Sequence, residues 1–244
     1  MLGYNVFDRQ LVQLPSGKIV ISTINAYSYV VAKSDGLFRR ALLESDILLP
    51  DGFSVVWAHR ILNGRRIRKI AGADIFFHLL KRANEQSQRV FFLGASQETL
   101  SLISERINAE FPQVTTDFFS PPFKNEFSDI ENQIMISKVN DFKPDILFVG
   151  MTAPKQEKWV YLNAASLNTS IICSIGAVFD FYAGTVSRPS SFWIKSNLEW
   201  FVRFVKEPRR LWKRYFIYSP LFFIDVLKAL LFRKSFQVGE NLEE

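Results

Sequence analysis

The sequence is poor in the residues that build disulfides and metal sites. It has one cysteine, Cys173, which stands in an apolar run, and two histidines, His59 and His78. A single cysteine excludes a disulfide scaffold, and a buried lone thiol fits a reducing compartment such as the cytosol. Neither histidine has a second plausible ligand at a spacing typical of metal sites. We therefore expect no resident metal ion.

Motifs that hold nucleotides in many enzymes are also missing. The segment Gly94–Gln97 does not match the G-x-G-x-x-G fingerprint, which argues against a Rossmann dehydrogenase, and there is no P-loop. No Asp-x-Asp pair occurs, although many sugar-nucleotide enzymes use one to hold a divalent ion on the diphosphate. In an enzyme of that class, other groups would have to neutralise the charge of the leaving diphosphate.

Positive charge is scarce outside one segment. Residues 195–234 contain ten Lys and Arg against three acidic residues, a surplus of seven, whereas the whole chain has a net charge of +6. The rest of the chain is therefore close to neutral, and it has no recognisable RNA- or DNA-binding motif, so we expect no nucleic-acid partner. The basic segment instead predicts a local anionic partner.

Short apolar runs rich in β-branched and aromatic residues alternate with longer stretches of helical periodicity. The expected strands are residues 19–24, 90–93, 146–149 and 170–175, and the clearest expected helices are residues 97–111 and 155–167. This alternation predicts an α/β, Rossmann-like fold with a mostly parallel sheet and helices on both faces. Residues 112–131, rich in Pro, Ser, Asn and charge, are expected to form a surface loop.

Composition changes near residue 190, where a basic and aromatic tail begins. We therefore expect an α/β domain over residues 1–194 and a helical C-terminal appendage over residues 195–244 that docks on a membrane.

Three of the predicted strands end in a glycine, namely Gly94, Gly150 and Gly176. Ligands of open α/β sheets bind at the carboxyl ends of the strands, where a glycine lets the ligand approach the backbone. Each glycine alone could simply make a turn, but the three together favour a ligand crevice. Pro154 then predicts the start of a helix whose N–H groups could bind an anion in that crevice.

A series of short motifs runs through the chain in a fixed order. They are Thr23-Ile24-Asn25, Pro50-Asp51-Gly52, Ala71-Gly72-Ala73-Asp74, Phe92-Leu93-Gly94, Pro154-Lys155-Gln156-Glu157-Lys158-Trp159, Gly176-Ala177-Val178-Phe179-Asp180, Ala183-Gly184, Arg188-Pro189, Leu198-Glu199-Trp200, Arg203 and Glu207-Pro208-Arg209-Arg210. Over roughly residues 20–215, this ordered set resembles the WecG/TagA/CpsF family of bacterial glycosyltransferases (glycosyltransferase family 26).

The resemblance implies transfer of a sugar from a UDP-sugar donor to a saccharide on a polyprenyl diphosphate. The sugar would be N-acetylmannosamine, its uronic acid, or a hexose such as glucose. The products feed teichoic acid, common antigen, capsule or exopolysaccharide synthesis. The resemblance also implies inversion at the anomeric carbon without a bound metal or other cofactor. It places the enzyme on the cytoplasmic face of the bacterial cell membrane as a peripheral protein.

The resemblance assigns Asp51 as the general base, which takes the proton of the acceptor hydroxyl. On the residues alone, Asp51-Gly52 would be a turn. Thr23 and Asn25 could hydrogen-bond sugar hydroxyls or phosphate, and their alternative is a strand-end turn or a helix N-cap. We also expect Gln156 to donate a hydrogen bond to the sugar or the diphosphate.

Three further positions are candidate contacts with the donor. Lys155 is a plausible countercharge for the diphosphate, and Asp180 could bind the ribose or uracil or be purely structural. The family usually has an arginine where this chain has Lys69. Lysine keeps the charge but loses the planar pair of donors, so the neighbouring Arg68 is an alternative.

The tail has cations at steps of three and four, which places them on one helical face. They are Arg203, Lys206, Arg210, Lys213 and Arg214. Pro208 divides the stripe between two helices or kinks one. The interleaved aromatics are typical of membrane interfaces. Residues 215–232 are almost wholly apolar but contain Asp225 and Lys228, so we expect an interfacial helix starting near Pro220, capped by Ser219.

The resemblance gives this tail a second role. Arg203, Arg210 and the cation at position 213 or 214 would reach the crevice and stabilise the departing UDP once residues 195–234 dock on the membrane. Off the membrane, the apolar tail favours a homo-oligomer. The alternative function is a non-catalytic scaffold of a polysaccharide assembly complex.

Overall fold

The computed structural model describes residues 1–11, 14–15, 17–186, 193, 196 and 198–240. Within them, six parallel strands form one sheet in the order β2-β1-β6-β5-β3-β4. The strands are β1 (Ile19–Ile24), β2 (Ile47–Pro50), β3 (Arg89–Gly94), β4 (Thr115–Phe119), β5 (Ile146–Gly150) and β6 (Ile171–Ser174). The predicted α/β fold and its four predicted strands are confirmed.

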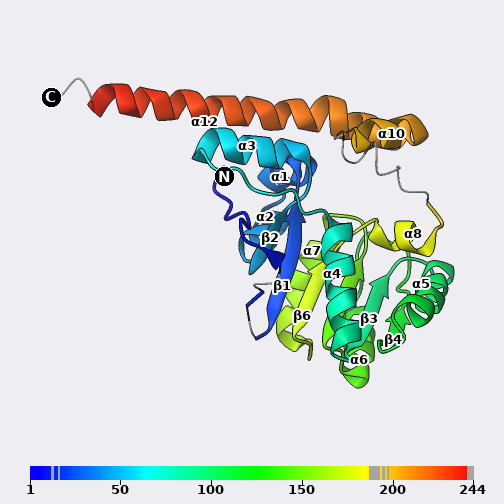
Figure 1. The fold of residues 1–244 in the computed structure, drawn as a ribbon. Helices are drawn as coiled ribbons and strands as arrows, with labels where there is room; N and C mark the ends of the chain where they lie inside the picture. Colours follow the sequence, from blue (N-terminus) through cyan, green and yellow to red (C-terminus); the bar gives the residue numbers. More distant parts are fainter. Residues whose placement is uncertain (12–13, 16, 187–192, 194–195, 197, 241–244) are drawn as a thin grey trace.

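Helices cover both faces of the sheet (Figure 1). The helices of the body are α1 (Ala26–Ser34), α2 (Gly36–Leu43), α3 (Phe53–Asn63), α4 (Gly72–Glu85), α5 (Gln97–Glu110), α6 (Asp129–Phe142), α7 (Lys155–Asn163) and α8 (Val178–Ala183). The alternation of side chains along each strand divides the core. On β3, for example, Val90 and Phe92 pack in the cluster with α4, α5 and α8, whereas Phe91 and Leu93 pack with α6 and α7.

Two short strands were not predicted. β2 has only four residues and all of them are buried, so no alternation of apolar and polar residues marks it as a strand. β4 lies inside the region 112–131 that we expected to be a loop, and α6 begins at Asp129, so that expectation is wrong for residues 115–119 and 129–131. As an edge strand paired only with β3, it carries polar side chains that are half-buried or exposed.

The tail lies across the end of the body where the strands have their carboxyl ends (Figure 1). It consists of α10 (Glu199–Lys206), α11 (Pro208–Lys213), the π-helical turn η3 (Arg214–Tyr218) and α12 (Ser219–Glu240). Its α12 packs on α1 and α3, and Phe222 and Val226 are buried in one cluster with side chains of those helices. The expected boundary at residues 194 and 195 lies outside the described residues.

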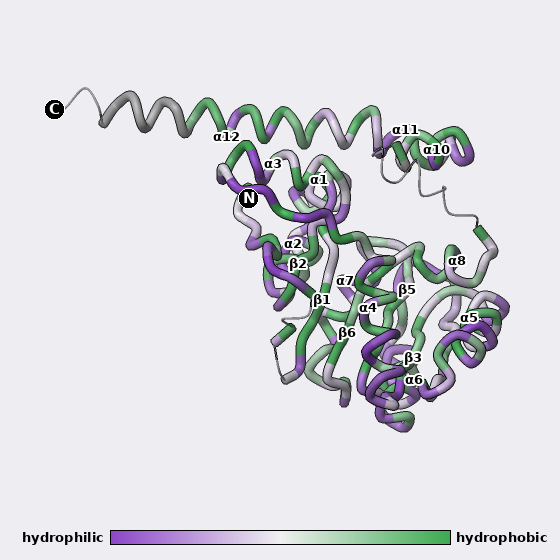
Figure 2. The backbone as a smooth tube through the Cα atoms, in the orientation of Figure 1, coloured by the Kyte–Doolittle hydropathy of each residue, from purple (hydrophilic) through white to green (hydrophobic). Residues whose placement is uncertain are grey.

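The helix of the tail is longer than we expected. Helical conformation continues from α11 through η3 into α12, so Ser219 does not cap a new helix: its hydroxyl donates to the carbonyl of Arg214 at 3.1 Å. The π-helical turn accommodates Pro220, which would clash in a regular helix. By length and composition alone, Leu211–Phe232 is the one helical stretch among the described residues that could cross a membrane. Figure 2 shows hydrophobic residues interleaved with hydrophilic ones along α10 and the described part of α12.

Candidate active site

Asp51 and Asn25 lie side by side at the carboxyl edge of the sheet. Asn25 directly follows β1 and Asp51 directly follows β2, and the two strands are paired so that Ile24 lies opposite Pro50. The N–H of Asp51 donates to the carbonyl of Ile24 at 2.9 Å, and the Asn25 amide nitrogen lies 3.5 Å from a carboxylate oxygen of Asp51. Backbone pairing therefore fixes the distance between these two side chains.

Both positions also have the local roles that the residues alone suggested. The Asn25 side-chain oxygen accepts from the N–H of Ser28 at 3.0 Å and so caps α1, while the Ser28 hydroxyl accepts from the N–H of Asn25 at 2.8 Å. Gly52 has a φ of +107°, which side-chain-bearing residues rarely adopt. The Asp-Gly step therefore turns the chain into α3 and leaves the Asp51 carboxylate half-buried at the edge.

Thr23 lies on β1 itself, two residues before Asn25. It is half-buried and is the register partner of Leu49. Because side chains alternate along a strand, the Thr23 side chain lies on the same face of the sheet as that of Ile21. This is the face that α4 covers. The structure thus brings Thr23 to the same sheet edge as Asn25 and Asp51.

Gln156 joins the chain segments that follow two neighbouring strands. Its side-chain oxygen accepts from the N–H of Met151, after β5, at 3.2 Å and from the N–H of Gly176, after β6, at 3.1 Å. Its amide nitrogen donates to Glu157 at 2.9 Å. The buried carboxamide therefore holds two strand ends together, and only one of its N–H groups is left for a substrate.

Glu157 is a buried acid that the sequence reasoning missed. It is only 3 % exposed, and its second oxygen, Oε2, is buried without a hydrogen-bond partner among the described residues. Burial raises its pKa from 4.5 to about 7, against the lowering effect of the hydrogen bond from Gln156. The Glu157 carboxyl group is therefore mostly neutral below about pH 7 and mostly ionised above it. Its position in Pro154-Lys155-Gln156-Glu157 was visible in the sequence, but its burial was not.

The strand-end glycines allow close packing. A Cβ on Gly94 would lie 2.4 Å from the carbonyl oxygen of Gly150, and a Cβ on Gly150 would lie 2.4 Å from the ring of Phe179. Gly176 has a φ of +58° and faces the Gln156 side chain. Glycine is therefore required at these positions by the protein itself, and their contact with a ligand stays a prediction.

Lys155 and Asp180 lie beside the site with partners of their own. The Lys155 ammonium contacts the carbonyl of Lys124 and lies 3.7 Å from the centre of the Phe127 ring, and burial lowers its pKa. Asp180 is half-buried on α8, and its backbone carbonyl accepts from Val186 at 3.2 Å. The geometry therefore directs the Lys155 charge toward the loop before α6.

Arg68 and Lys69 belong to the segment between α3 and α4. The N–H of the next residue, Ile70, donates to the carbonyl of Pro50 at 3.0 Å, which ties this segment to the residue before Asp51. Arg68 is exposed and Lys69 is half-buried. The structure thus places the backbone of this segment beside the residue before Asp51, and either cation remains a candidate for the role of the family arginine.

Among the tail cations, Arg214 lies over the site. Its guanidinium is 5.0 Å from the centre of the Tyr27 ring, two residues after Asn25. Burial lowers the pKa of Arg214; the charge of Arg203 also lowers it, whereas the charge of Asp51 raises it. Arg214, Arg203 and Asp51 therefore share one electrostatic neighbourhood.

The other tail cations are placed differently. Arg203 lies over the ring of Phe181 on α8 at 5.3 Å. Lys213 is exposed and lies 5.9 Å from the ring of Trp212, its neighbour on the same helix. The backbone of Arg210 is in α11, but its side chain lies outside what the structure describes. Of the alternatives at positions 213 and 214, the geometry favours Arg214.

Asp225 connects the tail to the body of the protein by an ion pair and a hydrogen bond. Its carboxylate lies 2.5 Å from the ammonium of Lys33 and accepts from the hydroxyl of Tyr29 at 3.2 Å, both on α1. Burial and this carboxylate raise the pKa of Tyr29 to about 12. The one acidic residue of the apolar stretch thus stabilises the docking of α12.

The side chains at this edge have three chemical capacities. A carboxylate can accept a proton, amide and hydroxyl groups can bind sugar hydroxyls, and cations can stabilise a leaving anion. In the described parts of the chain, no three His, Cys, Asp or Glu side chains gather as metal ligands would.

Comparison with known proteins gives a consistent result. Residues 5–236 match the Glycosyl transferase WecG/TagA/CpsF family. One relative is the N-acetylglucosaminyldiphosphoundecaprenol N-acetyl-beta-D-mannosaminyltransferase of Bacillus subtilis (strain 168), 33% identical over 89% of this chain and 82% of the relative. Enzymes with the same name are similar in Bacillus spizizenii, 29% identical over 85% and 78%, and in Staphylococcus aureus (strain MW2), 25% identical over 88% and 82%.

The family match covers the sheet, the site residues and most of α12. Together with the parallel α/β fold and the ordered motifs, it shows that this chain belongs to the WecG/TagA/CpsF family of glycosyltransferases.

Proposed function

We propose that this protein is an inverting, metal-independent glycosyltransferase that moves a sugar from a UDP-sugar to a saccharide on a polyprenyl diphosphate. The names of its relatives favour N-acetylmannosamine as the sugar and an N-acetylglucosaminyl diphosphate lipid as the acceptor. The observation that carries the proposal is the placement of a carboxylate, Asp51, beside Asn25 and within the electrostatic reach of Arg214.

In the proposed reaction, Asp51 takes the proton of the acceptor hydroxyl as its oxygen attacks the anomeric carbon of the donor sugar. The new glycosidic bond forms as the bond from that carbon to the β-phosphate oxygen breaks, and UDP leaves with the bonding electron pair. Arg214 and Arg203 stabilise the negative charge that develops on the diphosphate. Asn25 and Thr23 orient the sugars.

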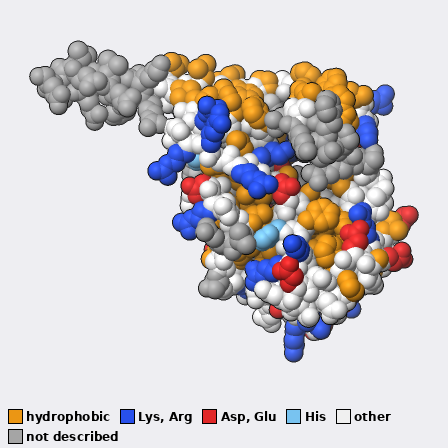
Figure 3. Space-filling model, in the orientation of Figure 1, with side chains coloured by type: hydrophobic (Ala, Val, Ile, Leu, Met, Phe, Trp, Pro, Cys, Tyr) orange, Lys and Arg blue, Asp and Glu red, His pale blue; other side chains and the backbone are white. Residues whose placement is uncertain are grey.

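The tail supports a place at the membrane surface. Figure 3 shows hydrophobic side chains gathered along α10 and α12 at one end of the molecule. Its exposed large side chains include Trp200, Phe201, Trp212, Phe216 and Leu227. Apolar and aromatic groups beside cations suit the boundary between headgroups and acyl chains. We infer peripheral association with the membrane that holds the acceptor, on its cytoplasmic side.

The test is UDP release from a panel of UDP-sugars with an acceptor carrying N-acetylglucosaminyl diphosphate on a short polyprenyl chain, in the presence of EDTA. Release with one donor identifies the sugar and shows that no metal is required. Release that needs an added divalent ion would refute metal independence. Absence of release across a wide acceptor panel would favour the scaffold alternative.

Asp51→Asn provides the matched variant, because the amide has nearly the same shape but cannot take the proton. We expect an unchanged fold by circular dichroism and a loss of about 10²-fold to 10⁴-fold in kcat. An unchanged rate would remove Asp51 from the role of base.

A further inference from the structure

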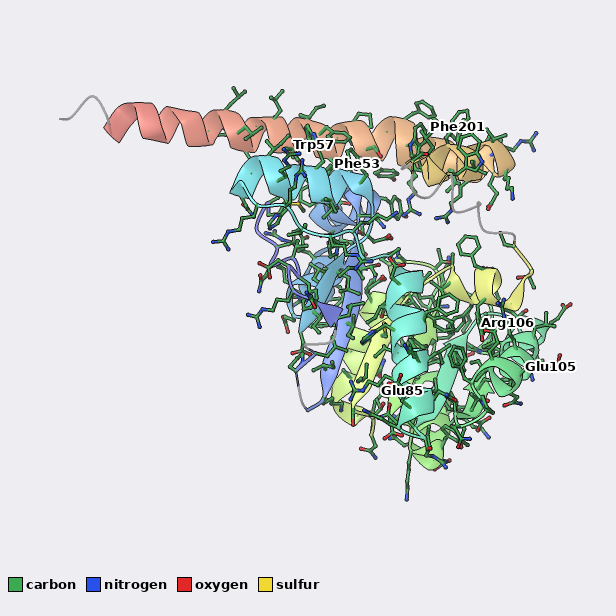
Figure 4. All side chains as sticks on the ribbon, viewed as in Figure 1. Phe53, Trp57, Glu85, Glu105, Arg106 and Phe201 are labelled. Carbon is green, nitrogen blue, oxygen red and sulfur yellow. The ribbon has the colours of Figure 1, made fainter. Side chains whose placement is uncertain are left out.

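Two large apolar side chains on α3 are exposed immediately beyond the proposed base. Phe53 stands two residues after Asp51 and is 55 % exposed, and Trp57 is 37 % exposed. They are one helical turn apart, about 6 Å along the axis. Figure 4 shows both on α3, at the level where α3 lies along α12. We call Phe53 and Trp57 the α3 strip.

The fold does not need the α3 strip for its core. The inward side of the helix carries Val55, Ala58 and Leu62, which are buried with side chains of α1 and α12. The outward residues Phe53 and Trp57 leave much of their surface to solvent. Exposed aromatics of this size at a site's edge point to a binding role.

The tail borders the strip on one side. The Trp57 ring meets the ring of Phe223 on α12 edge to face, with the ring centres 5.3 Å apart. Phe223 is itself 38 % exposed, and the outward side of α12 continues with Leu227 and Leu231. An apolar surface therefore extends from the residues beside Asp51, over the α3 strip, to the outer face of α12.

We propose that the α3 strip binds the first isoprenoid units of the polyprenyl diphosphate acceptor. This inference rests on the proposed function, which requires the acceptor sugar at Asp51 and its lipid chain in the membrane. The chain must leave the site across the protein surface, and the α3 strip is the apolar surface nearest to Asp51 in the chain. Past the α3 strip, the isoprenoid chain leaves the protein and enters the bilayer, so Leu227 and Leu231 on the outer face of α12 do not bind it.

The test measures binding and needs no transfer. Equilibrium dialysis of the full chain with geranyl, farnesyl and geranylgeranyl diphosphate, below their micelle concentrations, gives affinity against chain length. Each added isoprene unit should tighten binding by about fivefold while it lies on the strip. The double variant Phe53→Ser, Trp57→Ser should lose this increase with chain length.

The matched control is Leu227→Ser, Leu231→Ser on the outer face of α12, where the two side chains are 56 % and 57 % exposed. It should keep the dependence on chain length. If the α3 variant kept the dependence, or if the control lost it equally, the strip would not be the isoprenoid site. Equal unfolding temperatures for both variants and the wild type establish that the fold is intact.

Sedimentation with vesicles free of polyprenyl lipids separates the strip from general membrane contact. The α3 variant should bind them like the wild type. If it lost vesicle binding as strongly as the α12 variant, the bilayer itself would be the occupant and the proposal would be wrong. Binding that depends on chain length and on the α3 strip, in a protein that releases no UDP with any acceptor, would refute only the proposed function.

Discussion

Replacing Glu157 by Gln should change the stability of the protein in a manner set by pH. The carboxyl group is buried, its pKa is raised from 4.5 to about 7, and no described residue makes a hydrogen bond with its oxygen Oε2. Folding therefore favours the protonated form. This contribution is fully present below pH 4.5 and is lost as the pH rises through about 7.

The size of the effect follows from the two pKa values. Each pKa unit corresponds to about 1.4 kcal/mol, so the difference between 4.5 and about 7 corresponds to about 3 kcal/mol. Glutamine has the same shape, cannot ionise, and its side-chain oxygen can still accept from Gln156. The variant should be close to the wild type in stability near about pH 4 and more stable by up to about 3 kcal/mol near about pH 8.

Urea unfolding followed by circular dichroism, at several pH values from about 2 to about 8, measures the difference. Glu131→Gln is the control of opposite sign, because hydrogen bonds from Lys124 and Ser128 lower the pKa of Glu131 to about 2. Its carboxylate stabilises the fold above pH 4.5, and this stability is lost as the pH falls toward about 2. A stability difference for Glu157→Gln that is constant over this range would show that Glu157 is ionised in the folded protein.

Four other substitutions, one of them a control, test the tail and the packing of the strand ends. Arg214→Ala should lower kcat by about 10²-fold to 10³-fold. Lys213→Ala, the control, should change kcat by less than about twofold, because that side chain is exposed and lies against Trp212 of its own helix. Equal losses would contradict the choice of Arg214 over Lys213. Gly150→Ala forces a Cβ to within 2.4 Å of the Phe179 ring and should destabilise the fold by about 1–3 kcal/mol in urea unfolding; an unchanged midpoint would show that the ring moves freely. Asp225→Asn removes the ion pair with α1 and should speed hydrogen exchange in α12 while costing less than about 1 kcal/mol; unaltered exchange would mean that apolar packing alone holds the helix.

The sequence predicted the parts of the fold that have a strong local pattern. The strand at 146–149 is a continuous apolar run and the strand at 19–24 is rich in β-branched residues, and the structure has both within one residue. β2 has four residues that are all apolar and buried, so its sequence shows no alternation of apolar and polar residues. The polar character of β4 comes from its place at the sheet edge. Such strands are defined by their partners, and partners are not visible in a single sequence.

The same distinction between local sequence patterns and tertiary contacts applies to the candidate site. Asn25 could be placed at the carboxyl edge of the sheet because it follows a predicted strand. Asp51 was assigned through the family resemblance, because β2, the strand before it, was not predicted. The choice between Lys213 and Arg214 depends on the rotation of a helix that includes a π-helical turn, which the spacing of residues does not reveal. The burial of Glu157 arises from the packing of α7, and no local sequence pattern indicates this burial.

The attachment of Asp225 to α1 bears on how α12 can meet a bilayer. A helix that left the body to span the hydrocarbon would separate this carboxylate from Lys33 and Tyr29. An acidic side chain at the centre of a membrane-spanning helix costs about 2.5–3.5 kcal/mol on the insertion scale. These contacts of Asp225 hold one side of α12 against the protein, so that only the opposite side could contact lipid.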